Sequence, residues 1–199
     1  MRRVGKSCFM RMIVHGLRER RTPPENILFV DKESLDFDHV RTYDHLNKLV
    51  NRHFKGVSGE KYVFVDEVQE IDQWERTIAS LSGRKDMDVY ISGSNAHLLS
   101  NELATLISGR YIQFPIYALS FNEFRLFRGD SDGGRDEEFT NYLRYGGLPA
   151  IHYFDLNDEI VFQYISSIYD TILLKDVVQR NNVRNATLLD NLCRFLFDN

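Results

Sequence analysis

This 199-residue sequence has few cysteines and lacks long apolar runs and repeats, the features that mark disulfide-rich, membrane and repeat proteins. Its two cysteines, Cys8 and Cys193, lie far apart, so no disulfide framework or metal-ligand spacing is visible, and a reducing cytoplasm fits. The sequence has no signal peptide, and no apolar run reaches about 18 residues, so we expect a soluble protein with no membrane contact. Internal repeats are also absent.

The chain lacks an excess of positive charge. Its formal net charge of −4 argues against attraction of nucleic acid or anionic membranes over the whole surface, although it allows a local basic patch. Residues 1–21 form such an exception, with seven Lys/Arg side chains against one acid, Glu19. The apolar share of 43% and the aromatic share of 13% are typical of a globular chain, long enough for one core plus an appendage.

The first seven residues match the end of a phosphate-binding loop. They fit the last seven positions of the pattern G-x-x-x-x-G-K-[ST], with the opening glycine one position before Met1. In such a loop Gly5 lets backbone N–H groups point at phosphate oxygens, Lys6 places a positive charge on the β and γ phosphates, and Ser7 ligates Mg²⁺. A bare Gly-Lys-Ser also occurs by chance, so the following elements decide. The residues predicted to bind nucleotide are Arg3, Val4, Gly5, Lys6, Ser7 and Cys8.

Helices and strands are predicted to alternate after this loop. A period of about 3.6 residues between apolar positions predicts a helix over residues 7–20, which the Pro23-Pro24 pair ends. A short apolar run then predicts a strand over residues 26–31, buried on both faces. A second helix is expected over residues 38–54. Its three histidines are not spaced to share one metal ion, so we expect them to be solvated.

A second apolar strand ends in two carboxylates. Residues 61–65 predict a buried strand, and Asp66 and Glu67 follow at the end where open parallel α/β sheets place their ligand sites. This is the form of a Walker B motif, in which Asp66 holds Mg²⁺, directly or through water, and Glu67 orients and deprotonates the attacking water. The alternative is a solvent-exposed acidic strand end. Two independent motifs in the right order favour the nucleotide site.

A third strand is predicted over residues 88–91. It follows a helix that contains the single tryptophan, Trp74, which we interpret as a packing anchor rather than a ligand contact. Just beyond the strand, Ser94 and Asn95 are candidates for sensing the γ-phosphate and holding the lytic water. A helix N-cap is the competing interpretation of the same residues, and the two roles are compatible.

At this point the motifs resemble a large prokaryotic group of AAA-type ATPases. The similar segments are RRVGKS at 2–7, FVDEVQ at 64–69, ISGSN at 91–95, SGRY at 108–111, YALSFNEF at 117–124, YGGLP at 145–149 and YDTILLKDV at 169–177. The resemblance covers nearly the whole chain. It implies an α/β P-loop NTPase fold, a three-layer αβα arrangement with a parallel sheet, ATP binding and slow Mg²⁺-dependent hydrolysis. It also implies a C-terminal domain of unknown function that resembles a winged helix, but it supplies no substrate.

Arg110 is a further candidate for catalysis. It follows a helix-like segment, residues 96–107, and precedes a strand-like segment, residues 111–116. In AAA-type enzymes an arginine beyond the sensor strand often reaches the phosphates, commonly from a neighbouring subunit of a homo-oligomer, where it stabilises transition-state charge. The alternative is a surface arginine or an ion-pair partner, and the same alternative applies to Arg2 and Arg3.

Three regions are predicted along the chain. Residues 1–128 form the ATPase core, residues 129–180 a helical lid or linker, and residues 181–199 the start of a further domain. An acidic, turn-rich segment over residues 130–138 is expected to be a loop, and helices are expected over 139–145, 157–179 and 186–197.

Both ends of the chain are interpreted as incomplete. The order of elements lacks the strand that must feed the phosphate loop, so we expect that Met1 is internal or a misassigned start and that a further domain follows Asn199. Four or five buried strand side chains contribute roughly 6–15 kcal/mol. That is the size of a whole domain's stability, about 5–15 kcal/mol, so the isolated core is expected to be unstable.

The sequence therefore predicts a Mg²⁺-dependent ATPase whose hydrolysis drives a conformational change in an attached domain. The predicted catalytic residues are Lys6, Glu67, Ser94, Asn95 and Arg110, and the predicted metal ligands are Ser7 and Asp66. The alternative is a nucleotide-gated switch with little turnover that binds DNA or a protein partner through the further domain. A phosphoryl transferase is a third and weaker interpretation, because no acceptor site can be identified.

Overall fold

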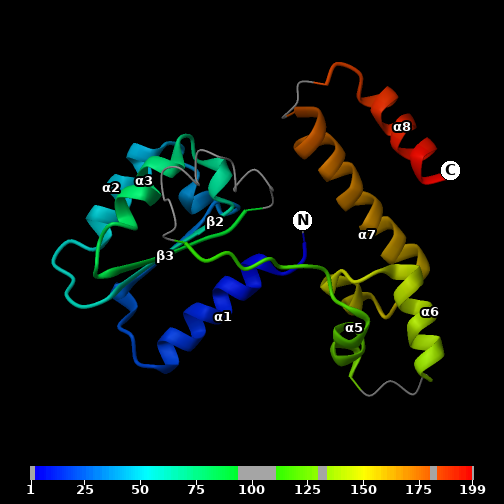
Figure 1. The fold of residues 1–199 in the computed structure, drawn as a ribbon, viewed down its shortest axis with the longest axis horizontal. Coiled ribbons are helices and arrows are strands. Elements are labelled where there is room, and N and C mark those ends of the chain that lie inside the picture. Colours follow the sequence, from blue (N-terminus) through cyan, green and yellow to red (C-terminus); the bar gives the residue numbers. More distant parts are fainter. Residues whose placement is uncertain (1–2, 94–110, 130–133, 180–182, 199) are drawn as a thin grey trace. The chain divides into compact units, whose positions relative to one another are not determined.

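The computed structural model describes residues 3–93, 111–129, 134–179 and 183–198. The chain forms two compact units (Figure 1). One comprises Gly5–Ile116 and contains the β-sheet, and we call it the sheet unit. The other comprises Tyr117–Asn199 together with Met1–Val4, and we call it the helical unit.

Three parallel strands form the sheet, in the order β1-β2-β3. Their bounds are β1 Ile27–Asp31, β2 Lys61–Asp66 and β3 Met87–Ile91. Asp31 is paired with Asp66, and Val65 is paired with Ile91, so the carboxyl ends of all three strands meet at one edge of the sheet. The predicted α/β class and the parallel sheet are confirmed.

Helices cover both faces of this sheet. Their bounds are α1 Lys6–Glu19, α2 Tyr43–His53 and α3 Trp74–Leu81, and short 3₁₀ turns occupy Pro24–Asn26 (η1), Leu35–Phe37 (η2) and Val68–Glu70 (η3). Alternate residues of a strand point to opposite faces. Val63 and Val65 of β2 therefore pack in one cluster with residues of α2 and α3, whereas Phe64 packs with Met10 and Leu17 of α1.

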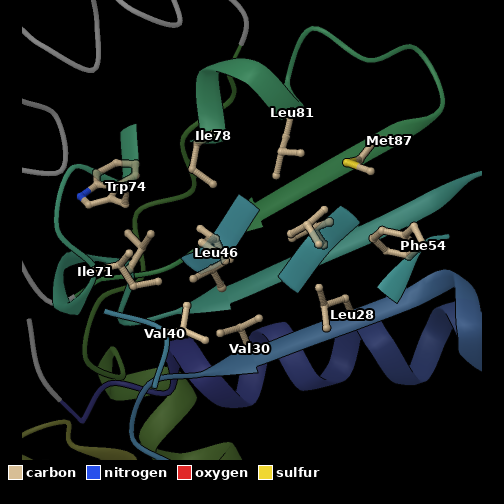
Figure 2. Close-up of a cluster of buried hydrophobic side chains, with 14 residues drawn as sticks. Leu28, Val30, Val40, Leu46, Phe54, Ile71, Trp74, Ile78, Leu81 and Met87 are labelled. Atoms are coloured by element: carbon tan, nitrogen blue, oxygen red, sulfur yellow. The ribbon is translucent and has the colours of Figure 1, made fainter. Parts of the chain in front are cut away.

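The larger cluster fills the layer between the sheet and helices α2 and α3 (Figure 2). Its members are Leu28, Val30, Val40, Leu46, Val50, Phe54, Val63, Val65, Val68, Ile71, Trp74, Ile78, Leu81 and Met87. Trp74 is 6% exposed in this cluster, in agreement with its interpretation as a packing anchor. Each fully buried aliphatic side chain stabilises the fold by about 1.5–3 kcal/mol, so this cluster stabilises the packing of α2 and α3 on the sheet.

The second helix is shorter than predicted. It begins at Tyr43 rather than at residue 38, because Thr42 caps it and its hydroxyl accepts the His45 N–H at 3.4 Å. Val40 falls on the helical period but is buried from the connection that precedes the helix. Val40 is apolar because it is buried in the core and not because it lies on a helix face. The apolar period therefore predicted the start of α2 too early.

The helical unit is built from α5 onward (Figure 1). Its elements are α5 Phe121–Arg128, α6 Arg135–Tyr145, the 3₁₀ segment η5 Pro149–Phe154, α7 Asp158–Thr171, a π-helical continuation Ile172–Gln179 (η6) and α8 Ala186–Asp198. Phe124, Tyr145, Ile151 and Val161 form its buried cluster. The predicted helices are confirmed, and α6 extends into the segment that was expected to be a loop. The lid role stays a prediction.

A close backbone contact explains the two glycines of the 145–149 segment. Gly146 ends α6 with φ 75. The backbone N–H of Leu119 donates to the Gly147 carbonyl oxygen at 2.7 Å, and a Cβ on Gly147 would lie 2.2 Å from the Leu119 carbonyl oxygen. Only glycine allows the chain before α5 to approach this closely.

The predicted strand over residues 111–116 is wrong. These residues have no regular secondary structure, and Ile112 and Phe114 are 80% and 66% exposed. A strand needs a neighbour for its backbone hydrogen bonds, and no strand of the described residues pairs with this segment. The two compact units divide after Ile116, and α5 packs with α6 and η5. The predicted regions 1–128, 129–180 and 181–199 stay predictions.

Candidate functional site

The phosphate-loop motif forms a tight turn that leads directly into α1. Gly5 precedes the helix with φ 98 and ψ 14, a left-handed conformation that residues with a Cβ rarely adopt. Arg3 also has a positive φ, 59. Among the described residues no side-chain hydrogen bond caps the helix, and no acid lies in its first turn. The first N–H groups of a helix have no acceptor within the helix and carry partial positive charge, so this end suits an anion.

An ion pair and the course of the chain relate α1 to the carboxyl edge of the sheet. The Arg11 guanidinium contacts the Asp31 carboxylate at 2.8 Å, and Asp31 is the last residue of β1. Arg11 lies in the N-terminal half of α1, and the end of α1 leads back to the beginning of β1. The beginning of the helix therefore lies at the same edge as Asp66.

Asp66 and Glu67, the two predicted carboxylates, follow each other at this edge but differ in environment. Asp66 ends β2 and is 1% exposed, whereas Glu67 is half-buried. An Asp66 carboxylate oxygen accepts a short hydrogen bond from the Ser92 hydroxyl. A buried carboxylate needs such a donor, because burial without a partner is costly.

Ser92, which follows β3, fastens the turn after β2. Its Oγ accepts the Glu67 N–H at 3.4 Å, and its carbonyl oxygen accepts the Val68 N–H at 3.0 Å. Its own N–H donates to the Val65 carbonyl oxygen at 3.0 Å. Ser92 was not among the predicted site residues. The available signal was its place as the first polar residue after β3, where aligned strand ends put it beside Asp66.

Glu67 adopts an unusual backbone conformation. Its φ and ψ of 52 and 51 lie in the left-handed region, immediately before η3. The Gln69 side-chain amide donates a short hydrogen bond to the Glu67 carboxylate. A non-glycine residue in this region costs about 1–3 kcal/mol, and such residues cluster at functional sites. Val68 and Ile71, which follow Glu67 in this turn, are 0% and 1% exposed and anchor the turn in the core cluster.

A cationic side chain that the sequence analysis did not single out follows β1. The Lys32 N–H donates to the Asp66 carbonyl oxygen at 3.4 Å, and the Lys32 ammonium donates to the Phe37 carbonyl oxygen at 2.6 Å. Burial lowers the pKa of Lys32 from its usual value, and the nearby Asp38 carboxylate opposes this shift. Its ammonium is thus held by the η2 turn.

The remaining predicted site residues differ in exposure, and some of them lie outside the described residues. Lys6 and Ser7, in the first turn of α1, are half-buried, and Cys8 is exposed. Arg3 and Val4 belong to the helical unit by their contacts. Ser94, Asn95 and Arg110 lie outside the described residues, so their predicted roles stay predictions.

The side chains at the strand edge fit a magnesium–nucleotide complex. Mg²⁺ prefers oxygen ligands and is commonly held by one or two protein groups together with phosphate oxygens. Ser7 on α1 and Asp66 at the end of β2 carry such oxygens, and their role as metal ligands stays a prediction. In the described part of the chain no group of three or more His, Cys, Asp or Glu side chains forms a separate metal cluster.

A parallel sheet between helices, a glycine turn before α1 and carboxylates at the carboxyl edge fit an α/β protein of the P-loop type. Residues 1–125 match the model of a family described as an AAA domain. The chain belongs to this AAA domain family. Membership indicates ATP binding, in agreement with the resemblance derived from the motifs.

Two curated relatives match over the full length of this chain. A protein of Haemophilus influenzae is 33% identical over 201 residues, and the match covers 50% of that relative. A protein of Methanocaldococcus jannaschii is 28% identical over 211 residues, and the match covers 46% of it. The chain thus spans about half the length of these relatives, and both are described as uncharacterized. No solved structure matches the chain.

The comparisons leave the winged-helix-like domain as a prediction. Among the described residues, no helix has the length and apolar character that crossing a membrane requires.

Proposed function

We propose that this protein hydrolyses ATP to ADP and phosphate in a Mg²⁺-dependent reaction. The observation that carries the proposal is the adjacent pair Asp66 and Glu67 at the carboxyl end of β2, one buried and hydrogen-bonded and the other half-buried. A protein that only binds nucleotide needs a metal-holding carboxylate but has no use for a second carboxylate as a base.

The phosphates are proposed to bind at the beginning of α1. The Gly5 turn and the first N–H groups of the helix would face the phosphate oxygens, and Lys6 would place its charge on the β and γ phosphates. Ser7 and Asp66 would hold Mg²⁺. When bound, the metal ion supplies neutralisation of charge on the β and γ phosphate oxygens.

Glu67 is proposed as the general base. Its carboxylate would accept a proton from the attacking water, while the Ser92 hydroxyl keeps Asp66 in a fixed orientation beside it. Ser94 and Asn95 are proposed to hold this water, and Arg110 to stabilise the charge on the transferred phosphoryl group, from its own chain or from a second copy. Coupling of hydrolysis to an attached domain is also part of the proposal.

The test is phosphate release from ATP with Mg²⁺ by the parent protein and three variants. Lys6→Ala is expected to lose nucleotide affinity, and Glu67→Gln to bind ATP with about 10²–10⁴-fold slower turnover. Glu70→Gln is the matched control, since Glu70 is an exposed acid of the same turn. Its turnover is expected to stay within about 2-fold of the parent.

Two results would contradict the proposal. A parent that binds ATP without releasing phosphate would favour the nucleotide-gated switch, with DNA or a protein as its partner. A parent that hydrolyses ATP equally fast after Glu67→Gln would show that another group is the base. Loss of activity in Glu70→Gln as well would mean that any charge change in this turn disturbs the site.

A further inference from the structure

We propose that Gln69 is a positioning residue that holds the Glu67 carboxylate in its catalytic orientation. The inference rests on the proposed function, because Glu67 acts as a base only in that reaction. The Gln69 side-chain nitrogen donates a short hydrogen bond to Oε2 of Glu67. Among the described residues, this is the one hydrogen bond to that carboxylate.

The chemistry of the two side chains decides which end of the amide faces Glu67. An ionised carboxylate only accepts hydrogen bonds, whereas a glutamine amide has a donating nitrogen and an accepting oxygen. The nitrogen must therefore face Glu67, and the Gln69 oxygen must point away. That oxygen is buried and has no hydrogen-bond partner within the described parts of the chain. The contact with Glu67 therefore leaves a buried acceptor unsatisfied, which lowers the stability of the fold. Stability alone does not explain a glutamine at this position.

The backbone of this turn is restrained independently of Gln69. Ser92 binds the N–H groups of Glu67 and Val68, and the Glu70 N–H donates to the Glu67 carbonyl oxygen at 3.0 Å. With the backbone held, the remaining freedom of Glu67 is rotation of its own side chain. Gln69 removes that freedom at Oε2 and leaves Oε1 to accept a proton from water.

Variants at position 69 separate positioning from binding. In Gln69→Ala the base remains but its orientation is lost, so kcat is expected to fall by about 10- to 100-fold. KM for ATP and the ATP affinity are expected to stay within about 2-fold, because Gln69 is not proposed to touch the nucleotide. Gln69→Glu keeps the shape of the side chain but faces the carboxylate with a like charge, so its kcat is expected to fall at least as far.

Gln73→Ala is the matched control. Gln73 also has a left-handed backbone, with φ 52, and its side-chain oxygen accepts from Arg76 at 3.1 Å rather than contacting Glu67. Its kcat is expected to match the parent. A double-mutant cycle with Glu67→Gln adds a test of coupling, since loss of Gln69 should cost nothing further once the base is gone.

The outcomes distinguish this inference from the proposed function. A parent that hydrolyses ATP together with a Gln69→Ala variant of unchanged kcat would overturn the positioning role alone. A raised KM with unchanged kcat would overturn it too, because Gln69 would then act in binding. A parent that binds ATP without hydrolysis would overturn both. If Gln69→Ala does not fold, the isosteric Gln69→Glu variant decides by the same kcat criterion.

Discussion

Replacing Ser92 should lower the stability of the sheet unit. Its hydroxyl donates to the buried Asp66 carboxylate and accepts the Glu67 N–H. A hydrogen bond to a charged group contributes about 1.5–3 kcal/mol, and a neutral one about 0.5–1.5 kcal/mol. Ser92→Ala removes both, so the free energy of unfolding should fall by about 2–4.5 kcal/mol. That loss is large against a typical total of about 5–15 kcal/mol.

Urea unfolding, followed by tryptophan fluorescence, measures the stability of the sheet unit. Trp74 is the single tryptophan, and it lies in the core cluster between the sheet and helices α2 and α3. Its signal therefore reports on the sheet unit and not on the helical unit. The expected result is a lower urea midpoint for Ser92→Ala with an unchanged slope, since the surface exposed on unfolding stays the same.

Ser82→Ala is the matched control for this measurement. The Ser82 hydroxyl donates to the Ile78 carbonyl oxygen at 2.8 Å, at the end of α3, without contacting a charged group. We expect its unfolding free energy to fall by less than about 1 kcal/mol. Equal midpoints for Ser82→Ala and Ser92→Ala would refute the reasoning, because the bond to Asp66 would then contribute no more than a neutral contact.

Two further predictions concern the helical unit. Gly147→Ala should destabilise it by about 1–3 kcal/mol, because the added Cβ would lie 2.2 Å from the Leu119 carbonyl oxygen; hydrogen exchange over residues 117–179 measures this, and unchanged protection would contradict it. Burial, with a smaller contribution from Arg128, lowers the pKa of His152, whose ring lies 4.7 Å from that of Phe124. The unfolded chain then binds the proton more readily, so stability should fall as the pH drops below about 6.5, by at most about 1.4 kcal/mol per pH unit. Hydrogen exchange at pH 5 and 7 should show this loss in the parent and not in a His152→Phe variant.

Local patterns were sufficient to locate the main elements of the sheet unit. The apolar runs of β1 and β2 are buried strands, and the periodic residues of α1 and α3 are helix faces that pack on the sheet. The apolar pattern gave wrong predictions where residues are apolar for a reason other than membership of a helix or strand. Val40 is apolar because the core buries it, and residues 111–116 are apolar without a neighbouring strand among the described residues.

The motifs of the site were likewise visible in the sequence. The Gly5 turn at the start of α1 and the Asp66-Glu67 pair at the end of β2 occupy the elements predicted for them. These positions follow from local chemistry, since glycine tolerates a positive φ and a polar pair ends an apolar strand. The roles of these residues in catalysis stay predictions until the variants are measured.

By itself, the sequence determined which residue types stand at the ends of the strands and where most helices and strands lie, because backbone preferences and apolar periodicity act over a few neighbouring residues. Only the tertiary structure decided that Ser92 donates to Asp66 and that Gln69 donates to Glu67. The first contact depends on the register between β2 and β3, and the second on a left-handed turn held by buried neighbours. The first contact joins segments far apart in the sequence, and the second joins residues two apart whose turn is held in its left-handed conformation by the surrounding core, so neither follows from apolar periodicity alone.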